Sequence, residues 1–465
     1  MPQLSVLTPP NKVEHPITEL VTGEDLVEHM LNIAANRPLP PRLFQLPHHC
    51  LPFKGWSVEC RVYAEDPIRN FLPSTGPLLN YVPPATVIGS GWRQDEWTEE
   101  AAQPSRSPVG RSRRAKAFPF HSTLRPTVRV DTGVFEGGQV NMYYDPLLAK
   151  LVTHDASREE AIVLMNSALD SYVIRGVENN LSFLRSVFRN KSFLAGDYST
   201  EFIAKEYPNG FRGIDLDSME SCKLIAFAIA VYQAKFGMKD YAEPALDRGT
   251  SELIEELIAI LPSPEREIRK VFRVYTSFDD AMNIEIKDIS QPSEEQTTVR
   301  IHNLDWIPGQ ALAKLNLSVS CAGDGSQGSG LVFEDDDDDE DKDGGMNVEE
   351  VMQFEGRTPE GILIRFNGSI QEVIVRTTRE HQLSAYMIPP IKKDVSRFLL
   401  SPMPGTLLTL LVKEGESVHP GQQLAIVEAM KMQNVLRAEK TGTVSRIQAS
   451  VGTHLKVDQV ILEFK

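Results

Sequence analysis

The residues that decide the fold of the C-terminal part are Glu428-Ala429-Met430-Lys431-Met432. The sequence repeats itself on either side of them, because Gly405-Thr406-Leu407 recurs as Gly442-Thr443-Val444 after 37 positions. Further matches at the same offset pair Gly415 with Gly452, Val418 with Leu455, Gln422 with Gln459, and Leu424 with Ile461. Such self-similarity predicts two copies of one strand-turn-strand unit, joined by a short link that carries Lys431.

Each copy contains short runs of β-type residues bounded by glycine turns. The runs are 407–412 and 424–427 in the first copy, and 444–447 and 460–464 in the second. Together they predict a small, flattened β-barrel with two-fold symmetry. The link between the halves is then a tight hairpin, and we expect Lys431 at its exposed tip.

A lysine at a hairpin tip is most often only a solvated charge. Here Lys431 lies at the centre of the repeat, and it is flanked by Met430 and Met432, which are costly to expose without a reason. The small side chain of Ala429 is expected to leave the tip sterically open. These features favour a function for the amine of Lys431.

The stretch Glu428 to Met432, with Met403-Pro404-Gly405 upstream, resembles the biotinyl domain of biotin-dependent carboxylases. In that family the lysine of Ala-Met-Lys-Met is joined to biotin by an amide. The resemblance implies biotin on Lys431, an attachment site formed by Glu428, Ala429, Met430 and Met432, and a biotin protein ligase as a partner. A tether on a rigid tip carries a reactive ring between two sites without releasing it.

A lipoyl carrier domain of a 2-oxoacid dehydrogenase is the alternative for this part of the chain. Lipoyl domains share the fold but usually carry Asp-Lys-Ala at the tip. The two methionines beside Lys431 therefore favour biotin.

Bulk properties exclude several classes of protein. The 465 residues predict two to four domains, and the net charge of −16 argues against nucleic acid as a partner. The 4 cysteines are scattered without paired spacing, so we expect neither disulfides nor a metal site. The apolar run 224–232 is too short to span a membrane. The acidic run 334–341 is typical of a solvated, disordered loop.

The N-terminal part alternates strand-type and helix-type patterns. An amphipathic helix is expected to open at 23–27 and to stop before Pro38, with strands at 56–63 and 128–133 and helices near 157–172 and 177–188. Several motifs in this order resemble the C-terminal part of a biotin carboxylase domain, whose ATP-grasp half lies upstream. They are Val13-Glu14-His15-Pro16, Glu59-Cys60-Arg61, Ala64-Glu65-Asp66-Pro67, Val128-Arg129, Tyr144-Asp145-Pro146 and Val173-Ile174-Arg175-Gly176.

Two residues carry chemistry by this match. Glu14 aligns with the general base that takes the proton from bicarbonate, a role that needs a carboxylate within reach of that proton. Arg129 aligns with the arginine that stabilises the enolate-like biotin anion, for which a fixed guanidinium is suited. Taken alone, both would more often be structural; several motifs in register favour the catalytic roles. The resemblance also implies ATP and Mg²⁺.

The chain departs from the family immediately before Glu14. The family pattern there is Glu-x-Asn-x-Arg-x-Gln, whereas this chain has Pro9-Pro10-Asn11-Lys12. No glycine-rich phosphate loop is found, and the Mg²⁺-binding residues have no counterparts. We therefore expect a truncated chain that cannot complete ATP-dependent carboxylation alone.

A third pattern begins near residue 204. A helix over 216–236 is apolar on nearly all sides and must be enclosed, and six strand-type runs follow it. The economical arrangement is a β-barrel around one helix. It resembles the domain by which propionyl-CoA carboxylase α subunits dock onto carboxyltransferase β subunits.

The predicted fold class is α+β and multidomain. Residues 1–203 form the C-terminal part of an ATP-grasp-type biotin carboxylase domain, with a disordered insertion at about 88–123. Residues 204–385 form the barrel domain, with an acidic loop at about 322–350. A linker at 386–399 leads to the biotinyl carrier domain at 400–465.

The predicted function is the biotin-carrying subunit of an acyl-CoA carboxylase. Such enzymes use ATP and bicarbonate to convert propionyl-CoA to methylmalonyl-CoA, and carboxybiotin on Lys431 would travel to a partner β subunit that binds the acyl-CoA. A non-catalytic biotinylated carrier and assembly protein is the alternative, and 3-methylcrotonyl-CoA or acetyl-CoA stay open as substrates. The resemblance implies the mitochondrial matrix, or the cytoplasm in a prokaryote; Met1 to Ser5 show no transit peptide.

Overall fold

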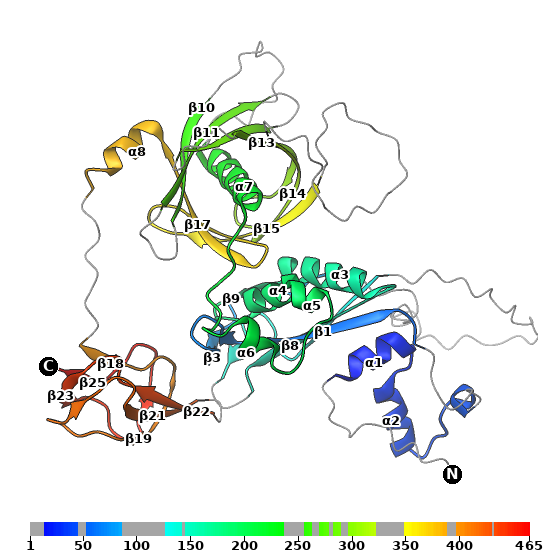
Figure 1. Ribbon diagram of the computed structural model, residues 1–465. Helices are drawn as coiled ribbons and strands as arrows, with labels where there is room; N and C mark the ends of the chain where they lie inside the picture. Colours follow the sequence, from blue (N-terminus) through cyan, green and yellow to red (C-terminus); the bar gives the residue numbers. More distant parts are fainter. Residues whose placement is uncertain are drawn as a thin grey trace, which may run out of the picture.

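The computed structural model contains three units that follow one another along the chain (Figure 1). It describes residues 14–44, 53–85, 126–141, 145–236, 255–262, 269–278, 282–289, 296–321, 348–387, 397–429 and 432–465. The expected insertion at 88–123 and the acidic run 334–341 lie outside the described residues, as do Met430 and Lys431.

The N-terminal unit is built on a three-stranded antiparallel sheet in the order β1-β8-β6. Its strands are β1 (Trp56–Tyr63), β6 (Thr127–Thr132) and β8 (Leu147–Asp155). Side chains alternate between the two faces of a strand, so Cys60 and Val62 point into an apolar core that helix α3 (Arg158–Ser171) completes. Residues between them, such as Arg61, face the other way, toward helix α1 (His15–Thr22).

Shorter elements complete this unit, and the predicted strands and helices are present. A capping box between Ser157 and Glu160 begins α3, and Asp25 caps α2 by accepting a hydrogen bond from the Glu28 amide at 2.7 Å. The remaining elements are α2 (Leu26–Ala34), η1 (Pro41–Phe44), β2 (Glu65–Asp66), β3 (Leu72–Pro73), β4 (Gly76–Pro77), β5 (Asn80–Val82), β7 (Gln139–Val140), β9 (Val173–Arg175), α4 (Leu181–Arg189), α5 (Lys191–Leu194) and α6 (Phe202–Glu206).

The middle unit is a closed barrel around helix α7 (Ser218–Phe236), as Figure 1 shows. Each strand pairs with the next, and the last pairs with the first, so the sheet has no free edge. The apolar helix is enclosed, because the stretch from Leu224 to Ile229 has no exposed surface. The strands are β10 (Glu255–Pro262), β11 (Arg269–Phe278), β12 (Met282–Asp288), β13 (Gln296–Asp305), β14 (Leu312–Cys321), β15 (Val348–Arg357), β16 (Ile362–Phe366) and β17 (Ser369–Thr377).

The prediction of a barrel around one helix is confirmed, with one correction. Residues 348–350 belong to β15 and pair with β14, so the acidic loop predicted at 322–350 ends earlier than expected. Helix α8 (Thr378–Ser384) follows the barrel and begins with a capping box between Thr377 and Glu380. The domain boundaries themselves stay predictions.

A buried polar network joins the barrel to the N-terminal unit. Gln353 of β15 donates hydrogen bonds to the backbone carbonyls of Asp170 and Tyr172, at 2.9 and 3.0 Å. Arg185 of α4 pairs with Asp170 at 3.0 Å and donates to Asn367 at 3.0 Å. Burial raises the pKa of Asp170 to about 6, although Arg185 opposes the shift. These two units are therefore fixed to each other by directional contacts.

The C-terminal unit consists of two four-stranded sheets that interleave the two sequence copies. The orders are β18-β25-β23-β20 and β22-β21-β19-β24, so each sheet takes one short strand from the other copy. The strands are β18 (Phe398–Leu400), β19 (Gly405–Leu410), β20 (Ser417–Val418), β21 (Gln423–Ala429), β22 (Met432–Arg437), β23 (Gly442–Ile447), β24 (His454–Leu455) and β25 (Val460–Phe464). Strands β19, β20 and β21 recur 37 positions later as β23, β24 and β25, which confirms the predicted doubled β fold.

Within the described ranges, no helix is both long and apolar enough to cross a membrane.

The network around Gln353 leads to a stability prediction. Gln353→Leu should lower the free energy of unfolding by about 1–3 kcal/mol, because two buried carbonyls lose their donor. Urea and thermal unfolding measure the loss. Gln139→Leu, on an exposed position of β7, is the control and should change stability by less than about 0.5 kcal/mol. Equal stability of the two variants would contradict the prediction.

Candidate functional site

The predicted biotin attachment site stands between two paired strands. Strand β21 ends at Ala429, strand β22 begins at Met432, and these two residues are Cα partners in the antiparallel ladder. In the sequence Met430 and Lys431 separate them; both lie outside the described residues, as does the side chain of Met432. A lysine amine is the group that biotin's carboxyl acylates, and Lys431 is the lysine between these strands.

The residues before Lys431 are held firmly by the core of the C-terminal unit. Ala429 is 2% exposed and packs in the cluster that contains Met403 and Leu407. Its small side chain therefore lies in the core beneath the hairpin, and the expectation that Ala429 leaves the tip open stays a prediction. Glu428 is half-buried, and its backbone pairs with Thr406 on one side and Gln433 on the other.

The motif Met403-Pro404-Gly405 has a structural role in this unit. Met403 is 1% exposed, and its sulfur lies 3.5 Å from the Asn434 amide nitrogen on β22. A Cβ at Gly405 would meet the carbonyl oxygen of Glu428 at 2.6 Å, so only glycine lets β19 approach β21 this closely. The motif thus supports the strand that leads to Lys431.

The other predicted residues, Glu14 and Arg129, lie on the polar face of the sheet in the N-terminal unit. Register places Arg61, Lys150 and Asp131 in one cross-strand row. Glu59, Val152 and Arg129 form the adjacent row. Directly paired residues share a face, so these side chains form a charged grid on one side of the sheet. We call this grid, with Glu14 and Glu19 from the α1 segment, the charged face.

Arg129 is held by two carboxylates on the charged face. Its Nη1 donates to Glu19 at 2.7 Å, and its Nε and Nη2 donate to the two oxygens of Asp131 at 2.7 and 3.1 Å. Lys150 lies 3.2 Å from Asp131. Burial acts to raise the pKa of Asp131, but Arg129 and Lys150 outweigh it, and the pKa falls below its usual value. The plane of the Arg129 guanidinium is thereby fixed.

Glu14 stands just before α1 and has a different partner. Its carboxylate is half-exposed and forms an ion pair with Arg61 of β1. Glu14 and Arg129 are thus brought to the same face of the sheet, but each is held by its own set of partners.

Glu59 was missed as a candidate in the sequence. Burial raises its pKa to about 7; Lys150 and Arg61 oppose the shift, while Glu14 and Asp131 add to it. Its Oε2 is buried and has no hydrogen-bond partner within the described part of the chain. The alternation in Glu59-Cys60-Arg61 places Glu59 and Arg61 on one face, but only the cover from α1 and its neighbours makes Glu59 titrate near neutral pH.

The raised pKa of Glu59 predicts a pH-dependent effect on stability. Above its usual pKa near 4.5, folded protein holds this proton more tightly than unfolded protein, so the contribution of Glu59 to stability falls as the pH rises to about 7. Glu59→Gln removes the effect. Relative to wild type, its melting temperature should rise progressively between pH 5 and pH 8, as thermal unfolding would measure. Glu159→Gln, on the exposed side of α3, is the control, and a pH-independent difference for Glu59→Gln would contradict the assignment.

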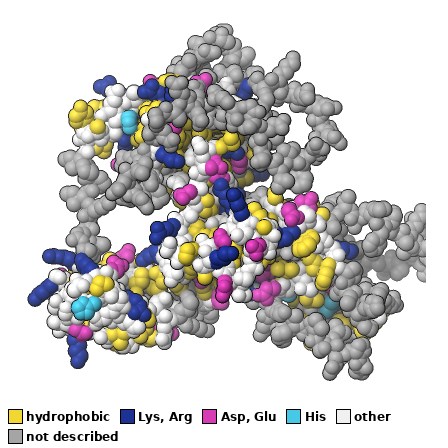
Figure 2. Space-filling view, in the orientation of Figure 1, with side chains coloured by type: hydrophobic (Ala, Val, Ile, Leu, Met, Phe, Trp, Pro, Cys, Tyr) yellow, Lys and Arg dark blue, Asp and Glu magenta, His cyan; other side chains and the backbone are white. Residues whose placement is uncertain are grey.

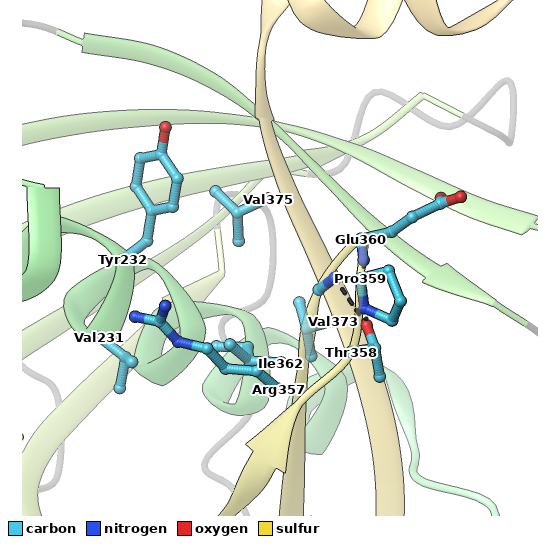
Figure 3. Close-up of a pocket in the computed structure, with 10 residues that line it drawn as sticks. Val231, Tyr232, Arg357, Thr358, Pro359, Glu360, Ile362, Val373 and Val375 are labelled. Atoms are coloured by element: carbon cyan, nitrogen blue, oxygen red, sulfur yellow. Dashed lines mark hydrogen bonds between the residues drawn. The ribbon is translucent and has the colours of Figure 1, made fainter. Parts of the chain in front are cut away.

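A pocket in the barrel is separate from the residues discussed above. The pocket opens at one end of the barrel and is lined by Tyr232 of α7, by Arg357 at the end of β15 and by Glu360 of the β15–β16 turn (Figure 3). It holds none of the predicted site residues. Among the described residues, no group of three or more His, Cys, Asp or Glu side chains is placed to hold a metal ion. In the view of Figure 2, Lys and Arg side chains project around the C-terminal unit.

Two parts of the chain match models of known families. A family model of the biotin carboxylase C-terminal domain matches residues 115–205, and one described as biotin-requiring enzyme matches residues 398–464. The chain is 36% identical over 461 residues to the propionyl-CoA carboxylase alpha chain of Ruegeria pomeroyi, covering 98% of this chain and 57% of that protein. The chain is a homologue of propionyl-CoA carboxylase alpha chains.

Two further relatives show how sequence identity to this chain varies. The human mitochondrial propionyl-CoA carboxylase alpha chain is 32% identical over 457 residues, covering 98% of this chain and 51% of that protein. The mitochondrial methylcrotonoyl-CoA carboxylase subunit alpha of Dictyostelium discoideum is 28% identical over 449 residues, covering 95% and 52%. The chain therefore spans about half the length of these relatives. The predicted resemblance to propionyl-CoA carboxylase alpha chains and the predicted fold class are confirmed by these matches, and the C-terminal unit matches the biotin-requiring domain.

Proposed function

We propose that this chain acts as the biotin-carrying subunit of an acyl-CoA carboxylase whose substrate is propionyl-CoA. The observation that supports this most is similarity along nearly the whole chain, which is 36% to a propionyl-CoA relative and 28% to a methylcrotonoyl-CoA relative. Biotin attached to Lys431 would carry the activated carboxyl group. The paired strands β21 and β22 would hold the attachment residue at a fixed end of the C-terminal unit.

In this proposal, side chains of the charged face accept the proton of bicarbonate and stabilise the negative charge of a developing oxyanion. Glu14 would accept the proton of bicarbonate, and its ion pair with Arg61 would hold the carboxylate in place for that step. Arg129 uses three of its N–H groups on Glu19 and Asp131, which fixes the guanidinium so that its remaining N–H groups can meet a developing oxyanion.

The partners and cofactors of the proposed enzyme follow from the same homology. They are a carboxyltransferase β subunit, which would bind the acyl-CoA, a biotin protein ligase, and ATP with Mg²⁺. The barrel would dock the β subunit. We propose the mitochondrial matrix as the compartment in a eukaryote and the cytoplasm in a prokaryote.

A non-catalytic biotinylated carrier is the second candidate. This candidate is favoured by the ion pairs of Arg129, because two carboxylates of the same chain largely neutralise its guanidinium. The carrier would be biotinylated and would bind β subunits, but it would not carboxylate biotin.

Biotinylation tests the part common to both candidates. The chain produced with an active biotin ligase should be detected by streptavidin and gain the mass of one biotin, whereas Lys431→Arg should gain none. Lys440→Arg, a second lysine of the C-terminal unit, is the matched control and should be labelled like wild type. A lipoyl adduct, or labelling of Lys431→Arg, would overturn the assignment.

Catalysis separates the two candidates. When the ATP-grasp half that the resemblance places upstream is supplied together with β subunits, bicarbonate-dependent ATP cleavage should fall about 10²- to 10⁴-fold in Glu14→Gln, because a general base is lost. Arg129→Lys should also slow turnover, since lysine cannot keep the two-oxygen contact with Asp131. Arg158→Lys, which contacts carbonyls of α5 away from this face, should keep activity. A biotinylated wild-type complex without ATP cleavage would favour the carrier.

A further inference from the structure

The hairpin formed by β2 and β3 touches the C-terminal unit, although the two are more than 300 residues apart in the sequence. We propose that this hairpin is a docking site for the biotinyl unit of the same chain, with Leu72 as the side chain that makes the contact. The hairpin belongs to the N-terminal unit, in which residues 115–205 match the biotin carboxylase C-terminal domain, so this contact would hold the carrier beside that domain. The proposal rests on the proposed function only in taking the docked unit to be the biotin carrier.

The contact is made to the half of the unit that supports the attachment hairpin. Leu72 is half-buried and packs against the apolar cluster that contains Met403, Leu407 and Ala429. Ala429 is the last residue of β21, immediately before the Met430-Lys431 link. In Figure 1 the C-terminal unit lies below β3, in agreement with this packing.

The hairpin that presents Leu72 has an unusual backbone. Asp66 pairs with Leu72 across the ladder, and the Asp66 carboxylate accepts hydrogen bonds from the amides of Ile68 and Arg69, at 3.0 and 3.3 Å. Two consecutive residues, Asn70 and Phe71, have positive φ angles of 56° and 58°. Asparagine tolerates this region, but a bulky phenylalanine does so only when its surroundings compensate.

An aromatic cluster supplies that compensation from behind the hairpin. The Phe71 ring meets Phe183 edge to face at 4.9 Å, and Phe183 in turn contacts Phe211 and Tyr207 at 5.5 and 5.2 Å. Ser74 fixes the end of the hairpin, since its amide donates to the Ala64 carbonyl at 2.8 Å and its hydroxyl accepts from the Glu178 amide at 3.0 Å. The strained turn is thus braced, and Leu72 is held in place for the contact.

The chemistry of the contact suits a carrier that must also leave. Within the described residues, the hairpin and the C-terminal unit share apolar packing and no hydrogen bond or ion pair. Apolar contact is non-directional, and that of a single leucine is weak. Because both units belong to one chain, their effective concentration is high, and a weak contact is enough to populate the docked state.

Photo-crosslinking in the full chain tests the contact directly. A photoreactive phenylalanine analogue at position 72 should crosslink to peptides from 398–465, as peptide mass spectrometry would identify. The analogue at Ile68, which is 66% exposed on the same hairpin, is the control and should give at least about tenfold less of this product. Equal yields from both positions, or no product within 398–465, would overturn the proposal.

Two further variants exclude misfolding and separate this proposal from the assignment of biotin. Leu72→Ala retains a small apolar side chain, and at an unchanged circular dichroism spectrum it should increase hydrogen exchange in peptides covering 403–410; unchanged exchange would count against docking. Lys431→Arg should keep the crosslink from position 72. Loss of biotin with the crosslink intact shows docking independent of the cofactor, whereas a crosslink lost only in Lys431→Arg would contradict docking through Leu72.

Discussion

The close approach of β19 to β21 is the constraint on which the C-terminal unit depends. The absence of a side chain at Gly405 lets the two strands approach, with the Glu428 carbonyl oxygen only 2.6 Å from where a Cβ would stand. That approach brings Met403 and Ala429 into one core, and it fixes the end of β21 from which the chain enters the Met430-Lys431 link. The proposed carrier role would need a rigid base for the amine, and packing under the hairpin would supply that rigidity.

The charged face follows a different logic, because its side chains are held by charge. An antiparallel register places acids and bases in rows, and α1 adds Glu14 and Glu19 to that grid. Each strong cation faces at least one carboxylate, which offsets the cost of partial burial. Glu59 is the exception among the acids: its Oε2 is buried without a hydrogen-bond partner in the described part of the chain, and burial raises its pKa to about 7.

Much of this architecture could be predicted from local sequence, since alternation gave β1 and the 37-residue offset gave the strands of the C-terminal unit. The enclosure of helix α7 could be predicted because its sequence is apolar on nearly all sides. Local sequence does not show which faces of the helices and strands pack against each other. Ala429 was chosen for its small size at the predicted tip, and its burial in a core shared by both copies of the repeat was not foreseen. Glu59 and Leu72 depend on elements far away in the chain, so neither alternation nor motif spacing singled them out.

The N-terminal unit contacts the barrel and the C-terminal unit through different kinds of interaction. Toward the barrel it uses Gln353, Arg185 and Asp170 in a buried network, where each group would be costly to separate from its partner. Toward the C-terminal unit it uses Leu72, a contact that can open without leaving a charge or a hydrogen bond unsatisfied. A directional network therefore suits two units that keep one arrangement. An apolar contact of one side chain suits a unit that alternates between two positions.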